Sequence, residues 1–291
     1  MQIYDSCKSA IESCLETKTF AVARLYNDEK TMSIHIHDCY EIYFSISGGK
    51  QFLIDNRVYE FMPGDMFFIN QYESHYLTQI DQMTHERIVL SIHPEYLKRL
   101  STEQTDLCFC FTCRDTAFGH RITLSEEEKK RFMYFVHKLS EQPEYGQDVL
   151  EQAVFAELMT CLNGIFLSRC AQKADAVQTD SQRTGKHDAR IDEILSYINQ
   201  NLAEDLNIPG LAAHFYLSGS YLCKIFKDET GTTINRYITA KRIARAKALL
   251  ADGYSVTETG NLCGFGDYSN FLKAFTKTVG VPPKKYATYV Q

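Results

Sequence analysis

Two stretches near the end of this chain, LSGSYLCKIFKDETGT (217–232) and GFGDYSNFLKAFTKTVGVPPKKY (264–286), share one design. At a constant offset of 49 residues, Lys224 aligns with Lys273, and the neighbouring apolar positions align as well. A match at a fixed spacing indicates a repeated structural unit. Each copy predicts a short helix, a turn and a second helix with lysine on its polar face. This arrangement suits insertion of the second helix into the major groove of DNA.

Capping residues predict where the helices of each copy begin and end. Ser218 and Asp267 precede the two second helices as N-caps, and Gly231 and Gly280 follow them as C-caps. A longer helix is predicted between the copies, over 234–250. Its basic residues, which are expected to neutralise DNA phosphates, are Arg236, Lys241, Arg242, Arg245 and Lys247.

The polar faces of the two second helices repeat although packing does not require it. Lysine, asparagine and serine reach the hydrogen-bonding groups on base edges in the major groove. A helical bundle with solvated lysines is the alternative, and it explains the apolar spacing alone. The residues expected on these faces, and predicted to bind DNA, are Ser220, Cys223, Lys224, Lys227, Ser269, Asn270, Lys273 and Lys277.

This region resembles the DNA-binding domain of the AraC/XylS family of bacterial transcription regulators over about 100 residues. The resemblance implies base contacts from Ser220, Cys223 and Lys224 in the first copy. In the second copy it implies contacts from the serine, asparagine and lysine at 269, 270 and 273. The chain departs from the family at Gly260, where alanine is usual. A glycine inside a helix costs about 1 kcal/mol relative to alanine.

Residues 20–95 contain short apolar stretches separated by turn formers, which predicts an antiparallel sandwich or barrel. The stretches are FAVARLY, EIYFSIS, QFLID, VYEF, MFFIN and RIVLSI. The run Cys108-Phe-Cys110-Phe-Thr-Cys113 alternates thiol and phenyl side chains, so we expect a strand there and no zinc site.

Histidines and one carboxylate recur in the first half of the chain. The stretch His35-Ile-His37-Asp-Cys-Tyr-Glu41 resembles the first cupin motif, and Pro63-Gly64-Asp65 with His75 resembles the second. A catalytic metal, a non-catalytic metal and a ligand pocket without metal are the three interpretations of this set. We expect a ligand pocket without catalytic residues and without metal. Its predicted effector-binding residues are His35, His37, Glu41, Tyr43 and His75.

Two apolar helices are predicted over about 124–170, where Ser125 and Glu128 have the spacing of a capping box. The expected fold class is therefore α+β, with four parts. They are a cupin-like antiparallel β-barrel (1–123), a helical coupling and dimerisation segment (124–170), a linker (171–187) and an all-α double helix-turn-helix (188–291).

Bulk composition narrows the functional classes. The 291 residues carry a net charge of −6, but residues 187–291 alone carry +2 and the remainder −8. This asymmetry suits an acidic sensor joined to a nucleic-acid module. No apolar run of about 18 residues predicts a membrane span, and no export signal is seen, so we expect a cytoplasmic protein. The ten scattered cysteines suit reduced thiols.

These observations predict a regulator that binds double-stranded operator DNA and responds to a small-molecule effector. The family resemblance adds a sugar or related carbohydrate as the effector class, RNA polymerase as a partner and a homodimer as the assembly. It implies neither an enzyme nor a cofactor. Two alternatives remain: a metal-dependent cupin enzyme with an appended DNA-binding module, and a helical adaptor that does not bind DNA.

Overall fold

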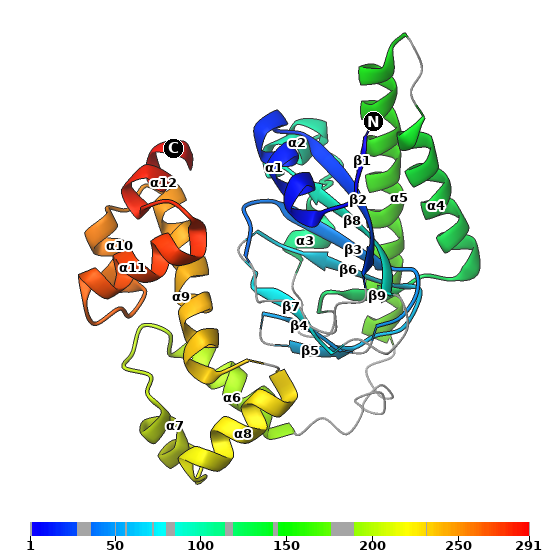
Figure 1. The fold of residues 1–291 in the computed structure, drawn as a ribbon. Helices are drawn as coiled ribbons and strands as arrows, with labels where there is room; N and C mark the ends of the chain where they lie inside the picture. Colours follow the sequence, from blue (N-terminus) through cyan, green and yellow to red (C-terminus); the bar gives the residue numbers. More distant parts are fainter. Residues whose placement is uncertain are drawn as a thin grey trace.

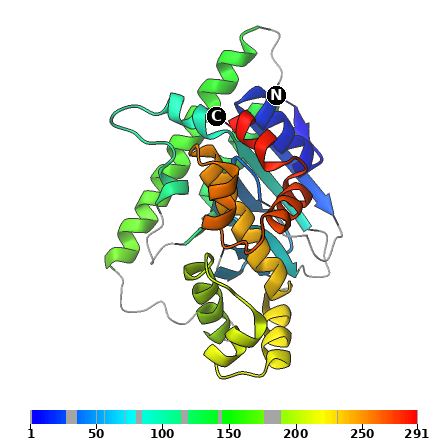
Figure 2. The same ribbon diagram turned by 90° about the vertical axis from the view of Figure 1, so that its left-hand side faces the viewer.

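The computed structural model describes residues 2–27, 36–49, 51–55, 57–71, 73–79, 85–113, 119–141, 145–175, 189–230 and 232–290. A sheet-rich N-terminal half is followed by the helices α4 and α5, and the C-terminal half is helical (Figure 1). Figure 2 shows the helical half from its own side, with the sheets behind it. The α+β fold class is thereby confirmed.

The strands of the N-terminal half pair into two sheets. The strands are β1 (Ile3–Tyr4), β2 (Phe20–Asn27), β3 (Tyr40–Ser45), β4 (Gln51–Ile54), β5 (Arg57–Glu60), β6 (Asp65–Ile69), β7 (His75–Gln79), β8 (His85–Ile92) and β9 (Arg121–Thr123). Six of them form one sheet in the order β1-β2-β8-β3-β6-β9, and three form another in the order β5-β4-β7. Only the β1–β2 pair is parallel among the described strands. The two sheets make a cupin-like sandwich in which the described strands do not join as one closed barrel.

The central strands β8, β3 and β6 of the six-stranded sheet are buried on both faces, which explains why they are nearly continuous apolar runs. On β3, Ile42 and Phe44 lie in the core that the sheet shares with the helices α3, α4 and α5. The intervening Tyr43 points to the opposite face, where it joins Phe52 of β4 and Phe67 of β6. Side chains alternate along a strand with period two, so one strand supplies both cores.

Helices cover the sheets and form the C-terminal half. They are α1 (Cys7–Thr17), α2 (Pro94–Leu100), α3 (Phe109–Thr112), α4 (Glu126–Ser140), α5 (Gln147–Asp175), α6 (Ala189–Gln200), α7 (Ile208–His214), α8 (Gly219–Thr230), α9 (Ile234–Ala251), α10 (Val256–Leu262), α11 (Tyr268–Val279) and α12 (Pro283–Val290). The capping box of α4 is present as predicted, with Ser125 and Glu128 each accepting the other's backbone N–H.

Helix α5 continues to Asp175, beyond the predicted end of the helical segment at about residue 170. Its stretch Gln147–Cys170 has the length and composition of a membrane span. One face of this stretch nevertheless packs in the sheet core through Phe155, Leu158 and Phe166. A core helix of a soluble domain passes the same length and hydropathy test, so α5 alone gives weak support for a membrane span.

The predicted strand at 108–113 is wrong, because α3 occupies this segment. The Cys110 N–H donates to the Asn163 side chain of α5, and Phe111 stacks on Tyr40. An alternating pattern of only six residues does not distinguish a strand from a single helical turn whose two sides are both buried. Here the segment forms a helical turn, because it packs against α5.

Candidate DNA-binding surface and sensor site

The predicted DNA-binding residues lie on the outer faces of α8 and α11. Seven of the eight are exposed, and Cys223 is half-buried at the edge of the core that α6, α7 and α8 share. The buried faces of the two helices hold Leu222 and Phe226 in α8 and Phe271 and Phe275 in α11. Helical periodicity then directs the residues between these positions to solvent.

The predicted caps fix where both helices start. The Ser218 hydroxyl accepts the Tyr221 N–H at 3.2 Å, and the Asp267 carboxylate accepts the N–H groups of Ser269 and Asn270. Gly280 ends α11 in the left-handed region, with φ 85°. Gly231, the predicted C-cap of the first copy, lies outside the described residues.

Helix α9 connects the two helix-turn-helix units, and two of its lysines face the sensor half instead of solvent. Lys241 forms an ion pair with Asp55, and Lys247 forms one with Asp38 at 2.5 Å. Both lysines are buried, at 8% and 4% exposure. We expected all five basic residues of α9 to neutralise DNA phosphates. This expectation is wrong for Lys241 and Lys247 in the structure, because carboxylates of the sheet domain already pair with both.

The ion pairs belong to a larger interdomain contact, a name that we use for Asp38, Asp55 and Tyr76 with their partners on the helical half. The Tyr237 hydroxyl donates to the Asp55 carbonyl at 2.7 Å, and the Tyr286 hydroxyl donates to the Asp38 carboxylate at 2.9 Å. Tyr76 of β7 donates to the carbonyl oxygen at the end of α8. The sheet domain thus holds both helix-turn-helix units, one beside α8 and one beside α12.

Three predicted effector residues meet inside the sheet domain, and we call His37, Glu41 and His75 the buried triad. The Glu41 carboxylate lies 2.9 Å from Nε2 of His37 and 3.6 Å from Nε2 of His75. The three residues are 6%, 3% and 1% exposed. His35, another of the five predicted effector-binding residues, lies outside the described residues.

Burial and charge oppose each other in the buried triad. Burial disfavours the imidazolium of His37, but Cys39 and Glu41 outweigh burial and raise the pKa of His37 to about 9. Burial also disfavours the carboxylate of Glu41, yet His75 and His37 hold its pKa well below the ordinary value. The same attraction raises the pKa of His75 against its burial.

Tyr43, also predicted to bind the effector, contacts a different histidine. Its hydroxyl hydrogen-bonds Nε2 of His85 at the start of β8, which the sequence did not suggest as a partner. Burial, followed by the charge of Arg87, lowers the pKa of His85 to about 4. A neutral imidazole beside a neutral phenol therefore fills this part of the interior, together with Phe61.

The neutral state of His85 predicts a pH dependence of stability. Its pKa is lower in the folded protein than the ordinary value of 6.5, so the unfolded chain takes up a proton first as the pH falls. Stability should fall from about pH 6.5 to about pH 4, by up to about 3 kcal/mol from this group. Urea titrations of wild type and His85→Gln across this range test the assignment. An unchanged pH slope in the variant would contradict it.

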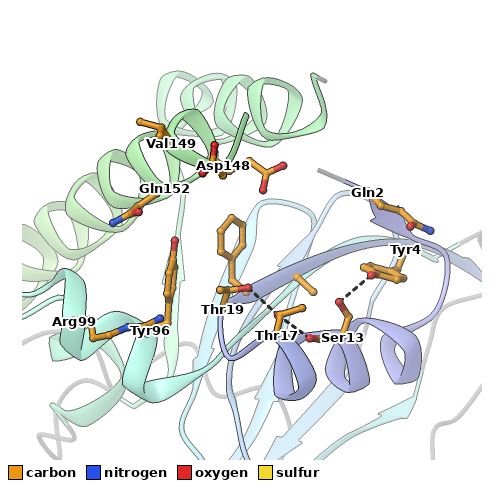
Figure 3. Close-up of a pocket in the computed structure, with 13 residues that line it drawn as sticks. Gln2, Tyr4, Ser13, Thr17, Thr19, Tyr96, Arg99, Asp148, Val149 and Gln152 are labelled. Atoms are coloured by element: carbon orange, nitrogen blue, oxygen red, sulfur yellow. Dashed lines mark hydrogen bonds between the residues drawn. The ribbon is translucent and has the colours of Figure 1, made fainter. Parts of the chain in front are cut away.

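A pocket of about 450 Å³ lies outside the sheet interior, between β2, α1, α2 and the start of α5 (Figure 3). Tyr96 and Arg99 of α2 face it from one side, and Asp148 and Gln152 of α5 from another. Hydroxyl groups of Tyr4 and of α1 add further polar atoms along its floor. Its volume lies within the range of small-molecule sites.

Two family models match this chain. Residues 19–128 match a model described as an AraC-like ligand binding domain, and residues 211–289 match a helix-turn-helix domain. The first range covers the strands and the buried triad. The second covers α8, α9 and α11.

Curated relatives are named as regulators. The chain is 31% identical to the regulatory protein PocR of Salmonella typhimurium over 140 residues, which is 48% of this chain and 46% of PocR. It is 21% identical to the probable transcriptional regulator LumQ of Photobacterium leiognathi, over 95% of this chain and 99% of LumQ. It is 20% identical to the transcriptional activator RhaR of Mannheimia succiniciproducens, over 87% and 86% of the two chains.

Among solved structures, apo ToxT from Vibrio cholerae aligns with 94% of this chain and 98% of its own, at 16% identity. The TM-score is 0.38, which is too low to establish a shared arrangement of the two halves.

Proposed function

Because the chain belongs to the AraC-type transcription regulators, with an AraC-like ligand-binding half and a helix-turn-helix half, we propose that α8 and α11 are its base-reading helices. The observation that carries this proposal is the repetition of exposed Ser220 and Lys224 as Ser269 and Lys273, each on a capped helix. Solvent-exposed side chains at matched positions suit readout of base edges.

The two helices differ at neighbouring positions, so we propose a bipartite and asymmetric operator. Tyr221 of α8 corresponds to Asn270 of α11, and Cys223 corresponds to Leu272. Two such helices on one face of a duplex read sites that are about 34 Å apart, one helical turn. Binding-site selection from random duplexes with the full-length protein tests this. Two different short motifs at that spacing support the proposal, whereas no enrichment would refute it.

We propose that the sensor half controls DNA binding through the interdomain contact. The ion pairs of Lys241, in the middle of α9, and Lys247, in its C-terminal half, anchor this connecting helix on the sheet domain, so the sheet domain influences the orientation of both helix-turn-helix units. A ligand that binds more tightly to one arrangement of the sheet domain and the helical half shifts the population toward that arrangement. Its effect on operator affinity cannot exceed its differential affinity for the two arrangements.

A small carbohydrate or related metabolite is our proposed effector, and the pocket of Figure 3 supports it better than the sheet interior does. Aromatic side chains fill the described interior, whereas the pocket combines Tyr96 with hydroxyl, carboxylate and guanidinium groups. Calorimetry with a panel of sugars tests the class. Arg99→Ala should lower the affinity of the responding sugar about tenfold, whereas Lys98→Ala on the same helix should not. Equal loss in both variants would contradict the pocket assignment.

We propose a homodimer formed through segment 124–170, because α4, the start of α5 and the residue Tyr145 just before it expose apolar side chains. Tyr134, Tyr145, Val149 and Leu150 are 57%, 94%, 65% and 47% exposed. Exposed apolar patches often mark association sites. Val149→Asp with Leu150→Asp should shift the protein from dimer to monomer in analytical ultracentrifugation, whereas Glu127→Gln on α4 should not. A wild-type monomer at micromolar concentration would refute this.

We further propose that the protein acts in the cytoplasm and contacts RNA polymerase at the promoter. We propose no catalytic role for it. Relatives that carry the names of transcription regulators support this assignment. An enzyme of the cupin type remains the competing function, and turnover of a small substrate by the purified protein would favour it.

A further inference from the structure

We propose that Arg190 of α6 contacts a DNA phosphate beside the bases that α8 reads, and that Tyr221 of α8 holds its guanidinium in position. The inference rests on the proposed function, because it takes α8 as a base-reading helix. It adds a residue from outside both helix-turn-helix units, and the contact of this residue is with the DNA backbone instead of base edges.

Arg190 and Tyr221 form a pair at the surface of the helical half. Nη2 of Arg190 donates to the Tyr221 hydroxyl at 3.2 Å, and the guanidinium carbon lies 5.7 Å from the centre of the Tyr221 ring. Both residues are exposed, and 41% of the Tyr221 surface is accessible. Arginine stacks on aromatic rings in this way, and the contact restricts the rotamers of its long side chain.

The core beneath the pair places it beside the outer face of α8. Ile191 and Leu222, which directly follow Arg190 and Tyr221, are fully buried in the core that α6 and α8 share (Figure 1). Tyr221 lies three residues before Lys224 on α8, so the two exposed side chains are neighbours on one face. The guanidinium of Arg190 therefore lies on the side of α8 that we propose faces DNA.

Packing and helix stability do not account for this arginine. At the offset of 49 residues, Thr239 of α9 takes the place of Arg190, and Asn270 of α11 takes the place of Tyr221. The second unit therefore folds without such a pair. Arg190 is also the second residue of α6, where the helix dipole disfavours a cation. A negatively charged partner outside the protein gives the position a use.

A DNA phosphate is the partner that this geometry favours. A guanidinium carries five N–H donors in a planar fork, so it can hold Tyr221 and a phosphate together. Phosphate contacts fix the register of a protein on the duplex without carrying sequence information. Holding the side chain in place before DNA binds also lowers the entropy lost on binding. Lys241 and Lys247 of α9 already pair with carboxylates, so a cation on α6 supplies a contact that these two do not.

The test measures how the affinity of the full-length protein for its selected operator depends on salt. Arg190→Ala should make the slope of log K against log[salt] shallower by about 0.9, and should lower affinity about eightfold at about 0.1 M salt. The loss should be similar on a random duplex, because a phosphate contact is independent of sequence. Arg190→Lys should keep the slope, since it keeps the charge. An unchanged slope in Arg190→Ala would overturn the proposal.

Arg24→Ala is the matched control, because Arg24 of β2 also stacks on a tyrosine, Tyr26, and donates to its hydroxyl. It should leave both affinity and slope unchanged. Lys224→Ala separates this inference from the proposed function, since it should weaken binding to the operator more than to a random duplex. If it does so while Arg190→Ala keeps the wild-type slope, only this inference fails. If neither variant changes operator affinity, the proposed function fails as well.

A double-mutant cycle tests the positioning role of Tyr221. Tyr221→Phe keeps the ring and removes the hydroxyl, so it should weaken binding about threefold without changing the salt slope. In the Arg190→Ala background the same substitution should have no further effect, because the hydroxyl acts through the guanidinium. Equal losses in both backgrounds, or a changed base preference in Tyr221→Phe, would show that Tyr221 contacts DNA itself and does not position Arg190.

Discussion

Lys273→Ala should lower the affinity of the full-length protein for its selected operator by about tenfold to a hundredfold. The ammonium group of Lys273 is exposed on α11, where it can reach base-edge acceptors, and loss of a good base contact costs roughly 1–3 kcal/mol. The fold should be unaffected, because the side chain contributes nothing to the core formed by Phe271 and Phe275. Mobility-shift titrations at fixed salt measure the change.

Lys284→Ala is the matched control for this prediction, since Lys284 is exposed on α12, outside the two helices that we propose read bases. It should change affinity about twofold or less. Lys224→Ala should weaken binding like Lys273→Ala, but it should relax the other half of the selected motif. Both lysine variants could instead lose base preference at the same positions of the motif, or neither could change the affinity. Either result would show that α8 and α11 do not read the operator as proposed.

Asp38→Asn combined with Asp55→Asn should release the helical half from the sheet domain. Lys241 and Lys247 lose the carboxylate charges of Asp55 and Asp38, and the buried ammonium groups are then less well compensated, so that the side chains should move toward solvent. The radius of gyration from solution scattering should increase, and exchange of α9 peptides should rise at least tenfold. Operator affinity should then become independent of the effector, because the sensor half no longer biases α9.

The control for the double variant is Glu103→Gln, which changes an exposed acidic residue of the sheet domain. Its scattering profile and its effector response should match wild type. A double variant that keeps the compact profile would show that apolar contacts of Leu53 and Tyr76 hold the halves together without the ion pairs.

The helical half could be predicted closely because its signals are local. Ser218 and Asp267 cap the helices as expected, and periodic apolar residues define the buried faces. Gly260 illustrates a limit. The sequence indicated a helix weakened by glycine, but a Cβ atom there would lie 3.0 Å from the Phe271 ring. The glycine thus allows α10 and α11 to pack closely, which only the tertiary structure reveals.

In the sheet domain, the positions of the strands could be predicted from the sequence, but the side-chain contacts between strands could not. The sequence grouped His37, Glu41 and His75, because side-chain alternation and motif spacing point to them. It also grouped Tyr43, which shares the face of Glu41 but lies against His85, a residue 42 positions away in the chain. The partners of Lys241 and Lys247 were not predictable, since no local pattern indicates which carboxylate of another domain a lysine will meet.

Cys223 is half-buried on the side of α8 that we propose faces DNA, so its thiol can serve as a natural chemical footprinting probe. A maleimide or iodoacetamide reagent should label this thiol in free protein. A duplex lying along α8 would shield it, while thiols of the sheet domain such as Cys113 would keep their labelling rate. Peptide mass spectrometry of Cys223 labelling can therefore report whether DNA occupies α8 specifically. The measurement uses the wild-type protein and needs a duplex that contains the operator, but not a map of its bases.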